Sequence, residues 1–254
     1  ALNDALITWR DRLHSALLAR YSELDAAAIE RRYGHSFPPA YQQEVAPELA
    51  VEDIADLEAG AQPAGAGAAR AASAGHLHLR RSLPDVARHL HLRLLRRAEA
   101  LPISDVVPIL ENFGLRVIAE HPYELQLPQQ RSAWLQDFEL EAQGELPADL
   151  SLLETQLRDA LPAILAGTLD NDGFHRLVLS AALTLPQTRV LRACCRYLLQ
   201  TGIPFSQSYM ERALNSHPFI TRELWLLFEA RFNPARSAAS ARRAATLSER
   251  RLRQ

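Results

Sequence analysis

The sequence contains no lysine: all 28 basic side chains among its 254 residues are arginines. Without lysine the chain cannot form a Schiff base through an amine side chain or supply a Walker lysine. Cysteine is limited to the adjacent pair Cys194 and Cys195, within a helical apolar pattern. We therefore expect both to be buried small hydrophobes, and not a disulfide framework. No apolar run approaches the ~18 residues of a membrane span, and no charged-then-apolar leader is present, so we expect a cytoplasmic protein that binds no membrane.

Positive and negative charges are also nearly balanced. The 28 arginines stand against 30 acidic residues, and the isoelectric point is near 6.5. A near-neutral chain is not typical of nucleic-acid binders, so we expect no nucleic-acid partner. The chain starts at Ala1 without a methionine and ends in an Ala/Arg/Ser tail, as a piece of a longer polypeptide would.

The first part of the chain, residues 1–60, is predicted to be a helical segment because its apolar residues recur at steps of three and four. The stripe consists of Leu2, Leu6, Trp9, Leu13 and Leu17. Gly34 and the pair Pro38–Pro39 end one helix and permit another. Residues 61–75, rich in Ala and Gly, have too little apolar bulk to pack and are predicted to be a flexible linker.

After the linker the period changes from 3.6 to 2, and residues 76–170 are predicted to form an α+β domain. In chain order the expected elements are strands 76–81 and 89–97, helix 103–113, strands 115–127 and 132–142, and helix 150–166. Gly114 ends the first of these helices, and Pro122 bends the next strand or confines it to a bulge or an edge. Short connections favour a mostly antiparallel sheet with helices on one face.

From residue 171 the pattern is helical throughout. Residues 171–234 are predicted to form a helical bundle, punctuated by prolines and by Gly202. Residues 235–254 are rich in arginine and nearly free of large apolar side chains, so we interpret them as a tail or tether, with a solvated helix as the alternative.

One small-molecule site has a physical rationale. Around Leu101, Ile103, Ser104 and Asp105 the chain passes from a strand to a helix N-terminus, where free N–H groups and the helix dipole favour a carboxylate. An amino-acid effector would fit there. The alternative is a plain helix cap, in which Ser104 or Asp105 satisfies those donors.

A metal site is a second hypothesis. The pairs His76/His78 and His89/His91 have strand spacing, so each pair shares one face, and adjacent strands could bring four imidazoles together. The alternative is the polar face of two amphipathic strands. No serine lies in a G-x-S-x-G elbow, and "GAGAAR" lacks the third glycine and the preceding strand of a dinucleotide site. We therefore predict no catalytic and no cofactor-binding residue in this chain.

Several longer stretches resemble one family. "LPISDVVPILENFGLRVIAEHPYEL", "DGFHRLVLSAAL", "GIPFSQSYMERAL", "LFEARFNP" and "SFPPAY" are similar to the large-subunit bacterial NAD-specific glutamate dehydrogenases. The resembling region of that family precedes the catalytic domain and contains ACT-like modules followed by a helical segment.

The resemblance implies a parent enzyme that converts glutamate, NAD and water to 2-oxoglutarate, ammonium and NADH. It implies that NAD is bound by the parent and not by this chain, since such enzymes use catalytic lysines and a nucleotide-binding domain. This chain would then be an ACT-like regulatory and assembly segment. Its partners would be the other domains of the parent, further copies in a homo-oligomer, and an amino-acid effector. The rival interpretations are a stand-alone interaction module without a small ligand, and a metal-binding module built on the four histidines.

Overall fold

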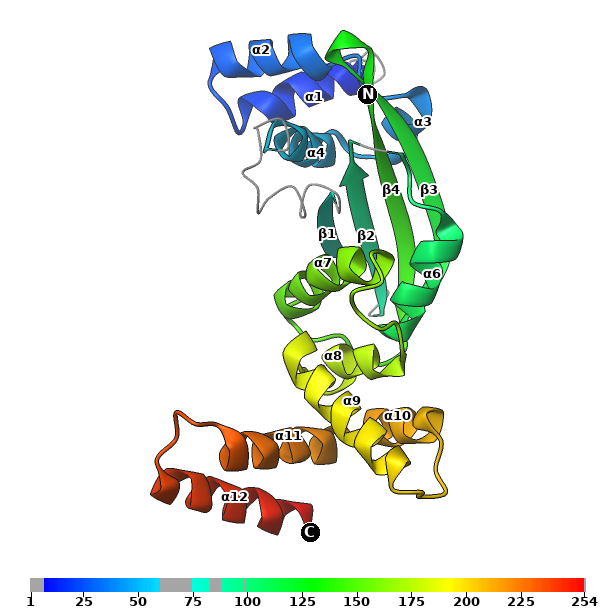
Figure 1. Cartoon of the computed structure of the whole chain (residues 1–254). Coiled ribbons are helices and arrows are strands. Elements are labelled where there is room, and N and C mark those ends of the chain that lie inside the picture. Colours follow the sequence, from blue (N-terminus) through cyan, green and yellow to red (C-terminus); the bar gives the residue numbers. More distant parts are fainter. Residues whose placement is uncertain (1–6, 60–74, 83–87, 98, 254) are drawn as a thin grey trace. The chain divides into compact units, whose positions relative to one another are not determined.

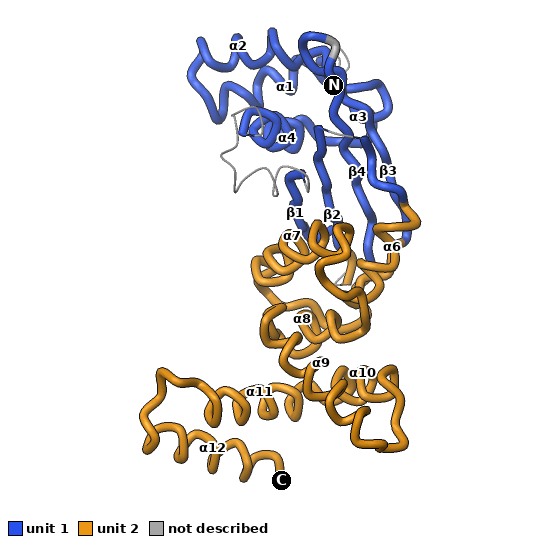
Figure 2. The backbone as a smooth tube through the Cα atoms, viewed as in Figure 1, with its two compact units in different colours: residues 1–82, 90–102, 118–140 blue, residues 83–89, 103–117, 141–254 orange. Residues whose placement is uncertain are grey.

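The computed structural model describes residues 7–59, 75–82, 88–97 and 99–253. It divides into two compact units, which Figure 2 shows in different colours. Unit 1 takes residues 1–82, 90–102 and 118–140, and unit 2 takes residues 83–89, 103–117 and 141–254. The predicted linker falls almost entirely on residues 60–74, outside the described residues. The boundaries of the predicted segments stay predictions.

Before the sheet, the described residues form four helices (Figure 1): α1 (Trp9–Leu18), α2 (Glu23–Tyr33), α3 (Pro39–Glu44) and α4 (Pro47–Ala59). Thr8 and Asp11 form a capping box at the start of α1. The described part of the predicted stripe, Trp9, Leu13 and Leu17, is buried as expected. Leu2 and Leu6 lie outside the described residues.

Aromatic rings form the centre of the unit 1 core. Phe37 and Tyr41 have ring centroids 4.7 Å apart, and Tyr123 meets Tyr41 edge-on at 5.3 Å. Trp9 packs on Phe37 at 5.5 Å, and its indole N–H donates to the carbonyl of Val45 at 2.9 Å. Such offset and edge-on contacts add to the free energy gained by burying the rings. The first helices and the strands therefore share one core.

The sheet has four strands in the order β1-β2-β4-β3: β1 (His76–Arg81), β2 (His89–Arg96), β3 (Leu115–Leu127) and β4 (Arg131–Ala142). β1 and β2 pair antiparallel. The α+β class is confirmed, with N-terminal and C-terminal helices flanking the sheet along the chain. β3 lies at one end of the strand order, as Pro122 predicts, because proline has no N–H to donate to a neighbouring strand.

The helix before β3 is α6 (Ile103–Asn112), whose Val106, Ile109 and Leu110 are buried. Gly114 follows with φ +82°, a left-handed conformation that glycine adopts without strain. Its N–H donates to the carbonyl of Glu111 at 2.9 Å and ends the helix. The predicted role of this glycine is confirmed.

Unit 2 is helical beyond the sheet, as the pattern predicts. Its elements are α7 (Ser151–Leu165), the 3-10 turn η3 (Gly173–Arg176), α8 (Leu177–Ser180), α9 (Leu185–Gln200), α10 (Gln207–Ser216), α11 (Pro218–Phe232) and α12 (Ala238–Leu252). A core around Phe174, Leu177 and Leu191 joins η3, α8 and α9. One expectation was wrong: Cys195 is buried on α9, but Cys194 is exposed, because adjacent helical residues point about 100° apart.

The arginine-rich end of the chain is a helix and not the tether that its composition favours. α12 packs against α11. Its buried Ala245 and Ser248 lie on one stripe with the partly buried Ala241 and Leu252, at steps of four and three. The ion pairs Arg231–Glu249 at 2.5 Å and Arg251–Glu223 at 3.0 Å join the two helices. Small side chains allow close packing even where large apolar residues are few. No helix among the described residues is long and apolar enough to cross a bilayer.

Candidate functional sites

The four residues of the predicted effector site divide between the two units. Leu101 belongs to unit 1, and Ile103, Ser104 and Asp105 belong to unit 2. Ser104 Oγ donates to the carboxylate of Asp105 at 3.2 Å, both within the first turn of α6. Pro108 has no N–H, so it cannot satisfy the carbonyl of Ser104 in the usual i to i+4 pattern.

The backbone of Leu101 is already engaged by a buried glutamine. Its N–H donates to Gln136 Oε1 at 2.8 Å, and its carbonyl accepts from Gln136 Nε2 at 2.9 Å. Gln136, on β4, also donates to Glu120 at 3.1 Å. The donor that the sequence offered to an effector carboxylate at Leu101 is therefore used within the protein. The effector site stays a prediction.

The strand register separates the two histidine pairs. His78 stands opposite Arg93, and Arg80 stands opposite His91. His78 Nε2 lies 2.7 Å and His76 Nδ1 3.4 Å from the carboxylate of Asp56 on α4.

His91 Nδ1 lies 2.9 Å from the carboxylate of Asp137, and His89 is half-buried at the start of β2. Within the ranges that the structure describes, no three His, Cys, Asp or Glu side chains gather closely enough to hold a metal. The four-histidine metal site stays a prediction, and metal analysis of chelator-free protein would test it.

A buried polar network lies between the helices and the sheet of unit 1. Arg93 on β2 donates to the carboxylate of Asp53 on α4 at 2.7 Å, and Tyr41 on α3 donates to the same oxygen at 2.5 Å. The side chains of Arg93 and Asp53 are 4% and 5% exposed. Asp137 on β4 lies 3.7 Å from Arg93 Nε and links the pair to His91. We call Tyr41, Asp53, Arg93, Asp137 and His91 the unit 1 network.

Burial sets the direction in which the pKa values of Asp53 and Tyr41 are shifted. Burial raises the pKa of Asp53 to about 6, although the Arg93 charge and the Tyr41 hydroxyl act in the opposite direction. Burial, with the charge of Asp53, also raises the pKa of the Tyr41 hydroxyl, which therefore stays a donor. Asp137 is also largely buried, at 9% exposed. Arg93 neutralises charge that would otherwise be costly to bury.

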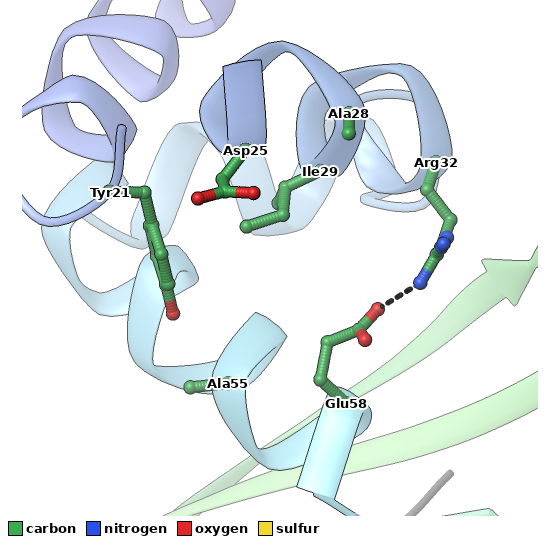
Figure 3. A pocket seen from close by; sticks show the side chains of 7 residues that line it. All are labelled: Tyr21, Asp25, Ala28, Ile29, Arg32, Ala55 and Glu58. Carbon is green, nitrogen blue, oxygen red and sulfur yellow. Dashed lines mark hydrogen bonds and ion pairs between the residues drawn. The ribbon is translucent and has the colours of Figure 1, made fainter. Parts of the chain in front are cut away.

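An open pocket of about 500 Å³ lies against α2 and α4 in unit 1 (Figure 3). Tyr21, Ile29, Arg32 and Glu58 are among its lining residues. The volume suits a small molecule. However, its charged groups are engaged with the protein: Arg32 donates to Glu58 at 2.7 Å, and Asp25 accepts from the Ser22 hydroxyl at 2.7 Å.

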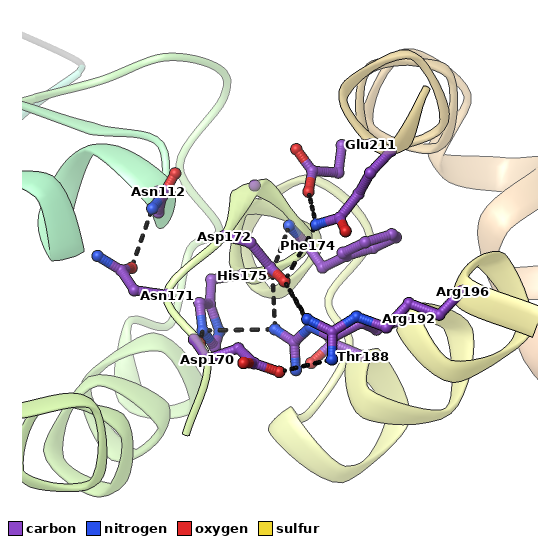
Figure 4. A network of polar contacts seen from close by, with 12 residues as sticks. Asn112, Asp170, Asn171, Asp172, Phe174, His175, Thr188, Arg192, Arg196 and Glu211 are labelled. Carbon is purple, nitrogen blue, oxygen red and sulfur yellow. Dashed lines mark hydrogen bonds and ion pairs between the residues drawn. The ribbon is translucent and has the colours of Figure 1, made fainter. Parts of the chain in front are cut away.

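Unit 2 has its own polar network, centred on the pair Asp172–Arg192 (Figure 4). Arg192 on α9 donates to both carboxylate oxygens of Asp172, from Nε at 2.7 Å and from Nη2 at 2.8 Å. Asp172 also caps η3 by accepting from the N–H of Phe174 at 3.2 Å. The guanidinium carbon of Arg192 lies 5.7 Å from the Phe174 ring centroid. A bidentate, largely buried pair of this kind fixes geometry as well as charge.

Neighbouring groups extend this network to α10. Arg196 pairs with Asp170 at 2.9 Å, and Gln207 on α10 donates to Glu211 at 2.7 Å. A Cβ at Gly173 would stand 2.7 Å from the Glu211 carboxylate, so a larger residue there would make the Glu211 side chain move. The network holds η3, α9 and α10 together and presents no nucleophile with a base beside it.

His175 is the buried histidine of unit 2. It is 0% exposed, stacks on Phe113 at 5.0 Å, and donates from Nε2 to the carbonyl of Asp170 at 2.7 Å. Its Nδ1 has no hydrogen-bond partner among the described residues. Burial lowers the pKa of His175 below 6.5, and the charge of Arg192 adds to that direction. The folded protein therefore holds this imidazole neutral.

The two networks predict opposite pH trends. A lowered pKa means that His175 contributes stability above pH 6.5 that is lost as the pH falls, with a slope of at most about 1.4 kcal/mol per pH unit. The hydrogen bond that His91 donates to the Asp137 carboxylate raises the pKa of His91, so its contribution to stability is present below pH 6.5 and is lost as the pH rises through the raised value. Hydrogen exchange of each unit between pH 5 and 8 measures the pH dependence of its stability. A His175→Gln variant with unchanged acid sensitivity of unit 2 would contradict the assignment.

Comparisons with known proteins cover most of the chain. Residues 16–59 match the family "glutamate dehydrogenase, helical motif 2", residues 75–153 match "glutamate dehydrogenase, ACT3 domain", and residues 169–234 match "glutamate dehydrogenase, helical motif 3". The unit 1 network thus links α3 and α4, in the first match, with β2 and β4, in the second. The Asp172–Arg192 network lies within the third.

Three curated relatives are named NAD-specific glutamate dehydrogenase. The protein of Halomonas elongata is 38% identical over 230 residues, that of Pseudomonas aeruginosa 34% over 229, and that of Mycobacterium tuberculosis 32% over 247. The alignments cover 89%, 90% and 95% of this chain. The chain spans only 14% of the length of each relative.

Proposed function

The chain belongs to the family of large NAD-specific glutamate dehydrogenases, and on that premise we propose that it is a regulatory and assembly segment of such an enzyme. The parent would convert glutamate, NAD and water to 2-oxoglutarate, ammonium and NADH. Since this chain has no lysine, a lysine-dependent dehydrogenation would draw its catalytic groups from elsewhere in the polypeptide. NAD would bind there too. We propose the cytoplasm as its location and a homo-oligomer as its assembled form.

The unit 1 network is the observation that carries this proposal. It ties α3 and α4 to the ACT-type sheet through a nearly fully buried ion pair, Arg93–Asp53, with Tyr41 bonded to the same carboxylate. A ligand or a neighbouring subunit that moved the sheet would therefore also move the helices of unit 1. Such rigid attachment is what a transmitting element needs, because buried pairs do not deform gradually.

The proposed mechanism is a shift between two states of the parent. An amino-acid effector, or a second subunit packed along the sheet, would bind one arrangement more tightly and so favour it. β3, at one end of the strand order, offers backbone groups for such packing, and its exposed Pro122 limits pairing at that position. Equal effector affinity in the active and inactive forms would contradict this mechanism.

The proposal is tested on the native polypeptide that contains "ENFGLRVIAEHPYEL". We expect an intact mass several times the 28.4 kDa of this chain, together with glutamate-dependent NAD reduction. A native chain of this size without that activity would favour a stand-alone interaction module. The two results differ in mass as well as in activity, so a poorly active preparation would not be mistaken for the second outcome.

A further inference from the structure

Helix α11 is apolar on more than one side. It contacts α10 and α12, and its Thr221, Glu223 and Ala230 are buried there. Large apolar side chains nevertheless remain exposed on it: Phe219 (52%), Ile220 (42%), Leu224 (36%), Leu226 (42%) and Phe232 (66%). A helix that is apolar around most of its circumference is normally covered on all sides. We therefore expect a partner to cover part of the exposed apolar surface of α11.

The α11–α12 hairpin is also strongly basic, unlike the rest of the chain. Residues 218–253 hold eight arginines and three glutamates, a net charge of +5, which leaves the remainder at −7 because the whole chain carries −2. Each glutamate already pairs with one arginine, as in Arg251–Glu223 and Arg236–Glu229. Five exposed arginines have no carboxylate within ion-pair distance among the described residues; they are Arg222, Arg242, Arg243, Arg250 and Arg253.

These charges and apolar side chains are arranged for docking a helix. Arg242, Thr246 and Arg253 are exposed along one side of α12, and Ile220 and Leu224 are exposed along the side of α11 that carries Arg231. A groove of about 340 Å³ runs between the two helices, and Arg231, Arg242 and Thr246 line it together with Ala230, Ala241 and Ala245. Alanines permit close backbone approach, and the arginines would pair with carboxylates of the incoming segment.

We propose that the α11–α12 hairpin docks an acidic, amphipathic helical face located elsewhere in the same large polypeptide. This rests on the proposed function, in which the chain is one segment of a protein about seven times its length, since it spans 14% of each relative. A phosphate backbone would use the arginines and leave Ile220, Leu224 and Phe232 exposed. An acidic helix with an apolar stripe satisfies both features together.

Hydroxyl-radical footprinting of the native full-length polypeptide tests this surface. We expect Ile220 and Leu224 to be protected, and to be oxidised about tenfold faster when Arg242→Glu and Arg253→Glu are combined, because reversing two partners replaces attraction with repulsion. Thr246→Glu, between them, should act in the same direction. The matched control reverses two exposed arginines of α9 and α10, Arg189→Glu and Arg212→Glu, and should leave the protection unchanged.

Four results would overturn the proposal. These are equal oxidation of Leu224 in native and variant proteins, protection that nuclease abolishes, protection that appears only with phosphatidylglycerol vesicles, and protection that is lost on dilution, as a second copy would require. Glutamate-dependent NAD reduction is recorded on the same samples. Protection without any regulatory response would uphold the docking surface and contradict the regulatory role, so the two failures are distinguishable.

Discussion

Replacing Arg93 with methionine is expected to lower the free energy of unfolding of unit 1 by about 3–5 kcal/mol at neutral pH. The substitution leaves Asp53, 5% exposed, as a buried carboxylate whose remaining partner in the network is the Tyr41 hydroxyl. Because Asp53 can escape this cost only by binding a proton, and the Arg93 charge that lowers its pKa is absent, the loss should shrink as the pH falls towards about 6, the pKa of this carboxyl in the native protein. Chemical denaturation and hydrogen exchange of α4 and β2 peptides measure this loss in the free energy of unfolding.

Two further variants make this prediction specific. Arg32→Met removes an arginine that is 55% exposed and pairs with Glu58, so it should cost no more than about 1 kcal/mol. Combining Arg93→Met with Asp53→Asn removes both buried charges and should restore most of the lost stability, because the asparagine can still accept from Tyr41. A cost for Arg93→Met that matches that of Arg32→Met would show that the pair is not the element that joins helices to sheet.

The second large effect is expected in unit 2. Arg192→Met should lower its free energy of unfolding by about 3–5 kcal/mol, because Asp172 would lose both guanidinium hydrogen bonds while remaining largely buried. The free energy of unfolding of the Arg192→Lys variant should lie between those of the Arg192→Met variant and the native protein. Lysine keeps the charge but cannot bind both carboxylate oxygens in a fork. Hydrogen exchange of η3 and α9 peptides reads this loss separately from unit 1.

The nearby Arg196 supplies the control. It pairs with Asp170 but is 46% exposed, so Arg196→Met should cost at most about 1 kcal/mol. If the Arg192 and Arg196 variants lost equal stability, burial would not be the cause, and the account of the network around Asp172 would fail.

The sequence predicted the elements of the fold well because their signals are local. The change of period from 3.6 to 2, the stop at Gly114 and the placement of Pro122 at an end strand each depend on a few neighbouring residues. The α12 hairpin was less visible because its packing face uses Ala241, Ala245 and Ser248, which an apolar count overlooks.

The unit 1 network escaped sequence reasoning because it depends on long-range pairing. The alternating His/Arg positions of β2 predict a polar strand face, but they do not indicate that Asp53 of α4 meets Arg93 there, forty residues away along the chain. One signal was available: the acidic positions of α4, Asp53 and Asp56, complement the basic face of the strands. Only the tertiary fold shows which of those charges meet and are buried.

Similarly, the effector hypothesis at Leu101 treated the helix start as having free donors. The fold supplies Gln136 from β4 to both backbone groups of that residue, a contact across 35 positions that no local pattern indicates. The histidine hypothesis depended on a strand register that the sequence could not provide, and the observed register places His78 opposite Arg93.

The most direct test of the regulatory role is glutamate-dependent NAD reduction by the native full-length polypeptide, titrated separately with each of the common L-amino acids. We expect at least one amino acid to change the rate. We expect this response to be weaker in the Arg93→Met/Asp53→Asn variant, which should keep its fold and the rate measured without an added amino acid. An identical response in both proteins, or no response to any amino acid in the native one, would contradict the claim that the unit 1 network transmits effector binding to the catalytic part.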